Sequence, residues 1–170
     1  STLKYGHNGV GSLWQLAGVE LEEAAGVKFQ DIAYSGGGTP IMAALAAGEI
    51  DVAIVNPAES QAMISAGKIK PLASMGQGRH PVLPDVPTAK ESGVAVTFPI
   101  WRGIFTTKGV SEQVLDTLDK AIEAATKSTE FQTYVKNSGL EVKFVGHREF
   151  SKFFEDQKRL VESRLKGKIK

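Results

Sequence analysis

The sequence predicts an α/β fold organised around a parallel β-sheet. From Leu3 to Met75, short apolar runs of strand type alternate with stretches of helical periodicity, and turns rich in glycine, serine and asparagine join them. Such alternation is typical of βαβ units, in which the strands are parallel. The chain has 170 residues, of which 42% are hydrophobic and 23% charged, so it can bury a core in one domain, or in one domain and part of another.

The expected elements follow one another closely in this first part of the chain. Leu13–Ala25 carries leucine and alanine at helical spacing, whereas Ile50–Val55 is a continuous apolar run suited to burial in a parallel sheet. Gly48 and Gly67 lie where a helix favours a left-handed residue after its last turn. In chain order, the expected strands and helices alternate as Leu3–Gly6, Leu13–Ala25, Phe29–Tyr34, Pro40–Ala47, Ile50–Val55, Pro57–Ala66 and Pro71–Met75.

The second part of the chain has a different composition. Gly76–Pro87 is rich in proline and glycine, which indicates a surface loop. Val94–Thr107 is longer than a usual strand and is expected to cross between two domains. The other expected elements are a short helix Thr88–Ser92, helices Glu112–Lys127 and Glu130–Ser138, a strand Leu140–Val145 and a helix Arg148–Lys166. The last helix has an apolar, phenylalanine-rich face that needs a packing partner.

Each early strand leads into a helix start of similar chemistry. The expected helix-start pairs are Ser12 with Gln15, Thr39 with Pro40, and Asn56 with Glu59. In a parallel sheet these starts all lie at the carboxyl edge, where ligands bind. A helix start presents unpaired N–H groups and about half a positive charge, and Gly9, Gly11 and residues 36–38 allow an oxygen close to the backbone. One such turn is usually structural, but three of them favour an anion site, and the scarcity of basic side chains favours a carboxylate.

The composition argues against several classes of function. The 20 basic and 19 acidic residues leave a net charge of +1, so no basic surface for nucleic acid is expected. The chain has no cysteine, and its histidines, His7, His80 and His147, are too far apart for a familiar metal motif. No nucleophile and base are paired, and Glu59 is better explained as a capping partner than as a general base. We therefore expect no catalysis, metal or cofactor, with a small phosphate-handling enzyme as an open alternative.

Several motifs resemble one known family. The similarity is carried by Tyr5–Trp14 (YGHNGVGSLW), Tyr34–Pro40 (YSGGGTP), Ala66–Lys68 (AGK), Leu83–Thr88 (LPDVPT) and Trp101–Gly103 (WRG). These segments are similar to the substrate-binding receptors of tripartite tricarboxylate transporters, also called the Bug or TctC family. The resemblance runs from Leu3 to about Leu165.

The resemblance implies a periplasmic-binding-protein type II-like architecture of two α/β lobes with a ligand in the cleft. Residues 1–99 would be lobe two, nearly complete, and residues 100–170 the C-terminal part of lobe one. The family's N-terminal lobe-one segment and signal peptide are absent from this chain, so self-association through the uncovered apolar face is expected. The implied function is the capture of a small di- or tricarboxylate in the periplasm of a Gram-negative bacterium, for delivery to the membrane components of the transporter. A ligand-sensing domain of the same fold, acting in signalling or regulation, stays open as an alternative.

The resemblance and the helix starts together define the expected site. The expected ligand-binding residues are His7, Asn8, Gly9, Gly11, Ser12, Leu13, Tyr34, Ser35, Gly36, Gly37, Gly38, Thr39, Asn56, Glu59 and Trp101. In the family, the third helix start often carries an Asp–Asn pair. Here Val55 precedes Asn56, so a ligand amine is not expected.

Overall fold

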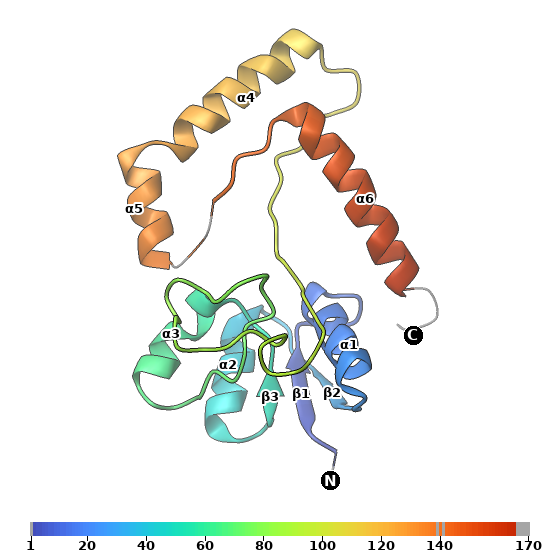
Figure 1. The fold of residues 1–170 in the computed structure, drawn as a ribbon, viewed down its shortest axis with the longest axis vertical. Helices are drawn as coiled ribbons and strands as arrows, with labels where there is room; N and C mark the ends of the chain where they lie inside the picture. Colours follow the sequence, from blue (N-terminus) through green and yellow to red (C-terminus); the bar gives the residue numbers. More distant parts are fainter. Residues whose placement is uncertain (1, 139, 141, 166–170) are drawn as a thin grey trace. The chain divides into compact units, whose positions relative to one another are not determined.

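The chain folds into two compact units. The computed structural model describes residues 2–138, 140 and 142–165. Their contacts divide the chain after Ile100 into an N-terminal unit and a C-terminal unit that begins at Trp101. The predicted α/β fold with a parallel sheet is confirmed, and it lies in the N-terminal unit (Figure 1). The assignment of the two units to lobes of a receptor stays a prediction.

The sheet of the N-terminal unit has three parallel strands in the order β2-β1-β3. They are β1 (Lys4–His7), β2 (Gln30–Ala33) and β3 (Val52–Ala53). Tyr5 of the central strand lies opposite Asp31 on one side and Val52 on the other. Because all strands point the same way, the segments that leave them begin at one edge of the sheet.

Helices cover both faces of this sheet. The helices are α1 (Leu13–Ala25), α2 (Gly38–Ala47) and α3 (Pro57–Ser65). The ring of Tyr5 is fully buried and lies against Gly18 of α1, whereas the next residue, Gly6, faces Ile41 of α2. Successive residues of a strand point to opposite faces, so α1 and α2 pack on opposite sides of β1.

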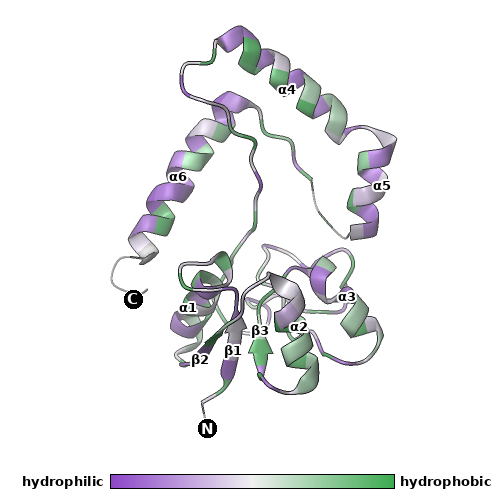
Figure 2. Ribbon diagram, turned by 180° about the vertical axis from the view of Figure 1, so that it is seen from behind, coloured by the Kyte–Doolittle hydropathy of each residue, from purple (hydrophilic) through white to green (hydrophobic). Residues whose placement is uncertain are grey.

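One hydrophobic core cluster lies on the α2 side. Ile41, Met42, Ala44 and Ile50 form a buried cluster. Figure 2 shows hydrophobic residues along β3 and part of α2, which agrees with this burial. Burying side chains of this kind stabilises a fold by about 1.5–3 kcal/mol each, so this cluster anchors the sheet edge that carries the helix starts.

The C-terminal unit consists of helices without a deep core. It contains α4 (Glu112–Thr126), α5 (Thr129–Ser138) and α6 (His147–Leu165), and α4 contacts the other two. Among its described residues only Val135 is buried. Phe105 and Tyr134 are each 59% exposed, and Phe153 is 36% exposed. In the described part of the chain, no helix is long and apolar enough to cross a membrane.

Three expected elements are wrong or incomplete. Pro71–Met75 does not form a strand; it makes one parallel bridge, from Ser74 to Thr88. Thr88–Ser92 forms turns instead of a helix: the Ser92 N–H donates to the Thr88 carbonyl at 3.1 Å, and Gly93 then turns the backbone at a φ of 87° before a second helical turn can follow. Residues 142–145 of the expected strand Leu140–Val145 have no strand partner, and residue 141 lies outside the described residues.

Candidate functional site

The first helix start follows β1 directly. Ser12 is the N-cap of α1, and its hydroxyl accepts the Gln15 N–H at 3.1 Å, as the capping prediction requires. Gly9 and Gly11 have φ values of 104° and 76°. Side chains strain the backbone at such angles, so this turn depends on glycine. An added Cβ at Gly11 would meet nothing within 4 Å, which leaves open space above the turn.

The backbone N–H groups of this turn are not equally available to a ligand. Gln15 Oε1 accepts the Gly11 N–H at 2.8 Å, and the Gly9 carbonyl accepts the Ser12 N–H at 3.2 Å. Within the described residues, the N–H groups of Leu13 and Trp14 have no hydrogen-bond partner. These two donors, at the first helical positions, are the ones that this helix start offers to an anion.

His7 and Asn8 lie below the turn. His7 is only 1% exposed, and its Nδ1 lies 3.0 Å from the Gly9 carbonyl. That contact shapes the turn from inside and leaves little of the imidazole for a ligand. Asn8 Oδ1 is buried and has no hydrogen-bond partner among the described residues. A buried amide oxygen without a partner is costly, so it is suited to accepting a donor that a bound molecule brings.

The second helix start differs from the sequence expectation. The sequence predicts Thr39 as the N-cap with Pro40 at the first helical position, but α2 begins at Gly38 and its N-cap is Gly37. The reason is the backbone conformation of two glycines. Gly36 and Gly37 have φ values of 97° and 83°, so the turn between β2 and α2 is complete before Thr39. Thr39 therefore lies within the first helical turn.

Tyr34 and Ser35 connect β2 to this second turn. The Tyr34 N–H donates to the His7 carbonyl at 2.7 Å and extends the pairing of β1 with β2 by one residue. Its side chain packs against the core cluster of α2. The first two helix starts are thereby tied together at the sheet edge.

The third helix start is the predicted one. Asn56 is the N-cap of α3, Pro57 is the first helical residue, and Glu59 Oε2 accepts the Asn56 N–H at 3.0 Å. The carboxylate of Glu59 also lies against Gly38, where an added Cβ would come within 2.8–3.1 Å of it. A negative charge therefore already lies beside the starts of α2 and α3, where it is stabilised by the helix dipoles. The start of α1 is the remaining favourable place for a ligand anion.

Trp101 lies in the other unit. Its ring packs edge-to-face on Phe150, Phe153 and Phe154 of α6, with centroid distances of 5.7, 5.5 and 6.0 Å. Phe105 joins the same aromatic cluster. The expected role of Trp101 in ligand binding stays a prediction.

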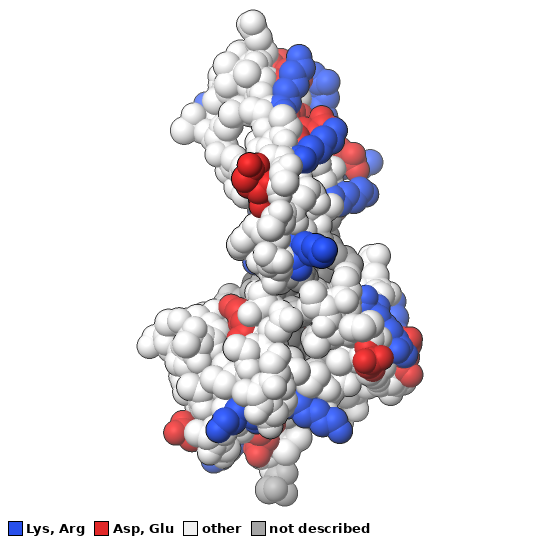
Figure 3. Space-filling model, turned by 90° about the vertical axis from the view of Figure 1, so that its left-hand side faces the viewer, with Lys and Arg blue, Asp and Glu red and all other residues white. Residues whose placement is uncertain are grey.

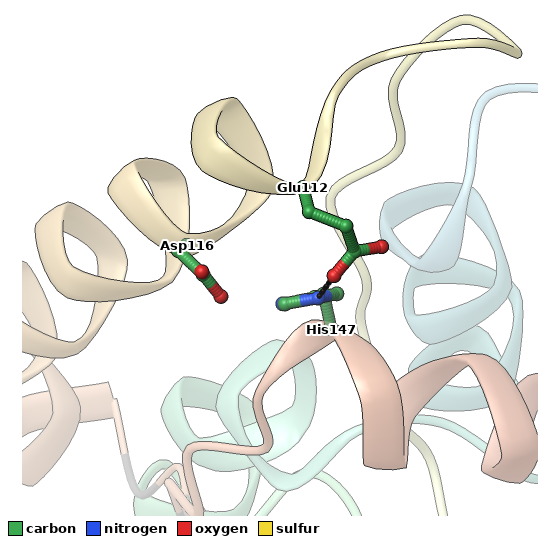
Figure 4. Close-up of side chains that lie close together, drawn as sticks. All are labelled: Glu112, Asp116 and His147. Atoms are coloured by element: carbon green, nitrogen blue, oxygen red, sulfur yellow. Dashed lines mark hydrogen bonds and ion pairs between the residues drawn. The ribbon is translucent and has the colours of Figure 1, made fainter.

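An acidic cluster that the sequence analysis did not single out joins α4 to α6. Glu112 and Asp116 of α4 point toward His147 at the start of α6 (Figure 4), and their potential ligand atoms lie within 4.8 Å of one another. His147 Nε2 lies 3.2 Å from Glu112 Oε2, and Arg148 Nη2 lies 3.0 and 3.4 Å from Glu112 and Asp116. The guanidinium already supplies the positive charge that a metal ion would bring, so this cluster acts as an electrostatic link between two helices.

Asp119 completes this link. Its carboxylate accepts from the backbone N–H of His147 at 2.9 Å and lies 2.7 Å from the ring Nδ1. The hydrogen bonds to Asp119 and then to Glu112 raise the pKa of His147 above its ordinary value. The hydrogen bond to His147 lowers the pKa of Glu112. These directions describe a set of mutually stabilising charges at the surface.

Surface charge is mixed on the face shown in Figure 3. Basic and acidic side chains are interspersed there, and large areas carry neither. A nucleic-acid surface would need basic residues clustered on one face. The described residues of this face provide no such cluster.

Comparison with known sequences gives consistent relatives. Residues 1–167 match the family described as the tripartite tricarboxylate transporter family receptor, TctC. The chain is 28% identical over 156 residues to a UPF0065 protein of Bordetella pertussis, covering 91% of this chain and 48% of that protein. It is also 28% identical to a UPF0065 protein from the tcbD-tcbE intergenic region of Pseudomonas sp. strain P51, covering 96% of this chain and 50% of the relative. The chain thus spans about half the length of these curated relatives.

Solved structures agree with these sequence relatives. Rpa4515 of R. palustris, solved with adipate, is 26% identical with a TM-score of 0.75, covering 96% of this chain and 52% of that one. MatC of Rhodopseudomonas palustris, solved with malate, is 29% identical with a TM-score of 0.69, and the match covers 81% of this chain and 47% of MatC. The periplasmic binding protein BugD is 29% identical with a TM-score of 0.69, and the match covers 96% of this chain and 53% of BugD.

Proposed function

Since this chain belongs to the TctC family of tripartite tricarboxylate transporter receptors, we propose that it captures a small di- or tricarboxylate for import. The observation that carries the proposal is the set of three helix starts at one edge of the parallel sheet. The proposed place of action is the periplasm of a Gram-negative bacterium, and the proposed recipients are the membrane components of the transporter.

The chemistry of the first helix start supports a carboxylate. The free N–H groups of Leu13 and Trp14 and the positive end of α1 together attract an anion. Asn8 adds a buried acceptor that suits a ligand hydroxyl or a protonated carboxyl group. The expected site residues include no lysine or arginine, so an ion is held by hydrogen bonds and released easily, as delivery to a transporter requires.

The ligands in related structures point to the same class. Rpa4515 was solved with adipate and MatC with malate, and both molecules are dicarboxylates. The presence of Glu59 beside α2 and α3 makes the start of α1 the favoured position for one carboxylate. The second carboxylate would then be neutralised elsewhere in the whole receptor.

The family consists of solute-binding proteins. We propose that this chain performs binding without catalysis, because the groups at the helix starts supply hydrogen bonds and no nucleophile paired with a base.

We propose that residues 1–99 form the second lobe of the receptor and residues 100–170 part of the first. The exposed rings of Phe105 and Phe153 in the C-terminal unit favour self-association of the purified chain. Light scattering on a size-exclusion column tests this: a concentration-independent monomer would contradict it.

Binding is tested by isothermal calorimetry and thermal shift with adipate, malate and citrate. Gly11→Val places a branched side chain in the open space above the first turn and should remove binding. Gly26→Val is the matched control, because Gly26 also has a positive φ, 66°, and open space at its Cβ, but it lies at the other end of α1. Absence of binding by the native chain, or equal loss in both variants, would argue against the proposed site.

A further inference from the structure

A hydrogen-bonded network lies behind the first glycine turn. Gln15 stands at the third position of α1, and its side chain reaches past the N-cap to the Gly11 N–H at 2.8 Å. Its amide nitrogen lies 3.3 Å from Asp31 Oδ2 on β2. A backbone N–H can only donate and a carboxylate can only accept, so these two partners fix which end of the carboxamide faces the turn.

Asp31 connects this network to the opposite side of the turn. The same Oδ2 that accepts from Gln15 lies 3.9 Å from Nε2 of the buried His7. Because the Gly9 carbonyl is only an acceptor, His7 Nδ1 must carry the proton that is shared with it at 3.0 Å. His7 therefore fixes the Gly9 carbonyl, while Gln15 fixes the Gly11 N–H.

The network restrains the two glycines of the first turn. Glycines lose more conformational freedom on ordering than other residues, and Gly9 and Gly11 both adopt positive φ values. A turn that is already ordered before binding does not lose that entropy when the ligand arrives. The restraint also directs the Gly11 N–H away from the ligand, so the free donors are those of Leu13 and Trp14.

We propose that Gln15, Asp31 and His7 are positioning residues that preorganise the first glycine turn for a carboxylate. This inference rests on the proposed function. None of the three residues needs to touch the ligand, and each acts on the site through the backbone of Gly9 or Gly11.

The first test needs no ligand. Hydrogen exchange of the Gly11 amide, measured by NMR, should accelerate about tenfold in Gln15→Ala and in Asp31→Ala, because the acceptor is lost or free to rotate. Asp31→Asn should restore slow exchange, since its amide oxygen still accepts from Gln15. Unchanged exchange in Gln15→Ala would overturn the network.

The second test measures affinity for adipate by calorimetry together with the melting temperature. Gln15→Ala, Asp31→Ala and His7→Leu should each weaken binding about five- to tenfold. Asp31→Asn and His7→Asn should recover most of it, because they keep the hydrogen bonds. Gln61→Ala is the matched control, an exposed glutamine on α3. For Gln15→Ala and the Asp31 variants, the melting temperature should stay close to that of the native chain.

The outcomes separate the two proposals. If the native chain binds no carboxylate, the proposed function fails, and the Gly11 exchange alone decides whether the network holds the turn. If the native chain binds and the alanine variants bind equally well, the positioning role is refuted while the proposed function stands. A loss of affinity only in proportion to lost stability, without recovery in the asparagine variants, would reduce these residues to a structural role and overturn the proposal.

Discussion

Replacing Gly18 by alanine should destabilise the N-terminal unit, although glycine to alanine inside a helix usually stabilises. Helix propensity alone favours alanine by about 1 kcal/mol. An added Cβ at Gly18 would lie 2.4 Å from a ring carbon of Tyr5, about 1 Å inside the 3.4 Å at which ordinary contact begins. The ring cannot move away easily, because Tyr5 is fully buried and its hydroxyl donates to the Trp14 carbonyl.

The overpacking therefore outweighs the propensity. Such insertions cost about 1–3 kcal/mol, and because the overlap with the buried ring is severe we take the upper end; after the propensity gain of about 1 kcal/mol, the free energy of unfolding should fall by about 2 kcal/mol. For a unit of this size the melting temperature should fall by about 10 °C. The hydrogen bond from Tyr5 ends at the first turn of α1, so the same strain should disturb the proposed ligand site.

The assay is urea unfolding followed by tryptophan fluorescence. The chain has two tryptophans, so a Trp101→Phe background leaves Trp14 as the reporter of the N-terminal unit. Repeating Gly18→Ala in a Tyr5→Leu background removes the clashing ring and should turn the effect into a small stabilisation. An unchanged or higher urea midpoint for Gly18→Ala alone, or no dependence on Tyr5, would refute the packing argument.

Three further changes test other parts of the structure. Glu22→Ala should lower the free energy of unfolding, measured with urea, by about 1–3 kcal/mol. The buried Glu22 carboxylate accepts the Phe29 N–H at 2.7 Å, and alanine would leave that N–H without its acceptor. His147 has a raised pKa, so its stabilising contact with α4 is complete below its ordinary pKa of 6.5 and is lost as the pH rises through the raised value. The lowered pKa of Glu112 preserves the contact down to pH 4.5. Helix stability, followed by circular dichroism, should therefore fall as the pH rises above 6.5, and His147→Phe should abolish this change. Trp101→Ala should lower the stability of the C-terminal unit by about 2 kcal/mol in thermal circular dichroism, because its ring contacts three phenylalanines, and an unchanged melting curve would mean that this aromatic cluster is energetically weak.

Helix starts could be predicted where the signal is a short-range hydrogen bond. Ser12 and Asn56 cap α1 and α3 as expected, because a cap involves only residues within one turn. The prediction of Thr39 as the cap of α2 is wrong, because two glycines with positive φ begin the helix earlier. Such angles are open to glycine in any turn, so the sequence does not say which glycine uses them.

Strands were less predictable, because a strand exists only when a neighbour pairs with it. Ile50–Val55 is apolar throughout most of its length, yet only Val52–Ala53 pairs with β1. Pro71–Met75 is also largely apolar and makes a single bridge. The pairing partner lies far along the chain, and its distance from the strand cannot be read from the local pattern.

The sequence by itself determined the α/β class, the parallel sheet edge and the glycine-rich first turn, because strand–helix alternation, helix caps and glycine conformations depend on only a few neighbouring residues. Only the tertiary structure decided how that turn is held. The pairing of Tyr5 with Asp31 brings a carboxylate from β2 beneath α1, where Gln15 links it to Gly11 and His7 lies close to it. The sequence predicts that His7 contacts the ligand, and this stays a prediction; in the structure, its buried imidazole lies 3.0 Å from the Gly9 carbonyl. Contacts between segments far apart in the chain thus occupy several polar groups near the turn. Among the described residues of this turn, they leave the N–H groups of Leu13 and Trp14 as free donors.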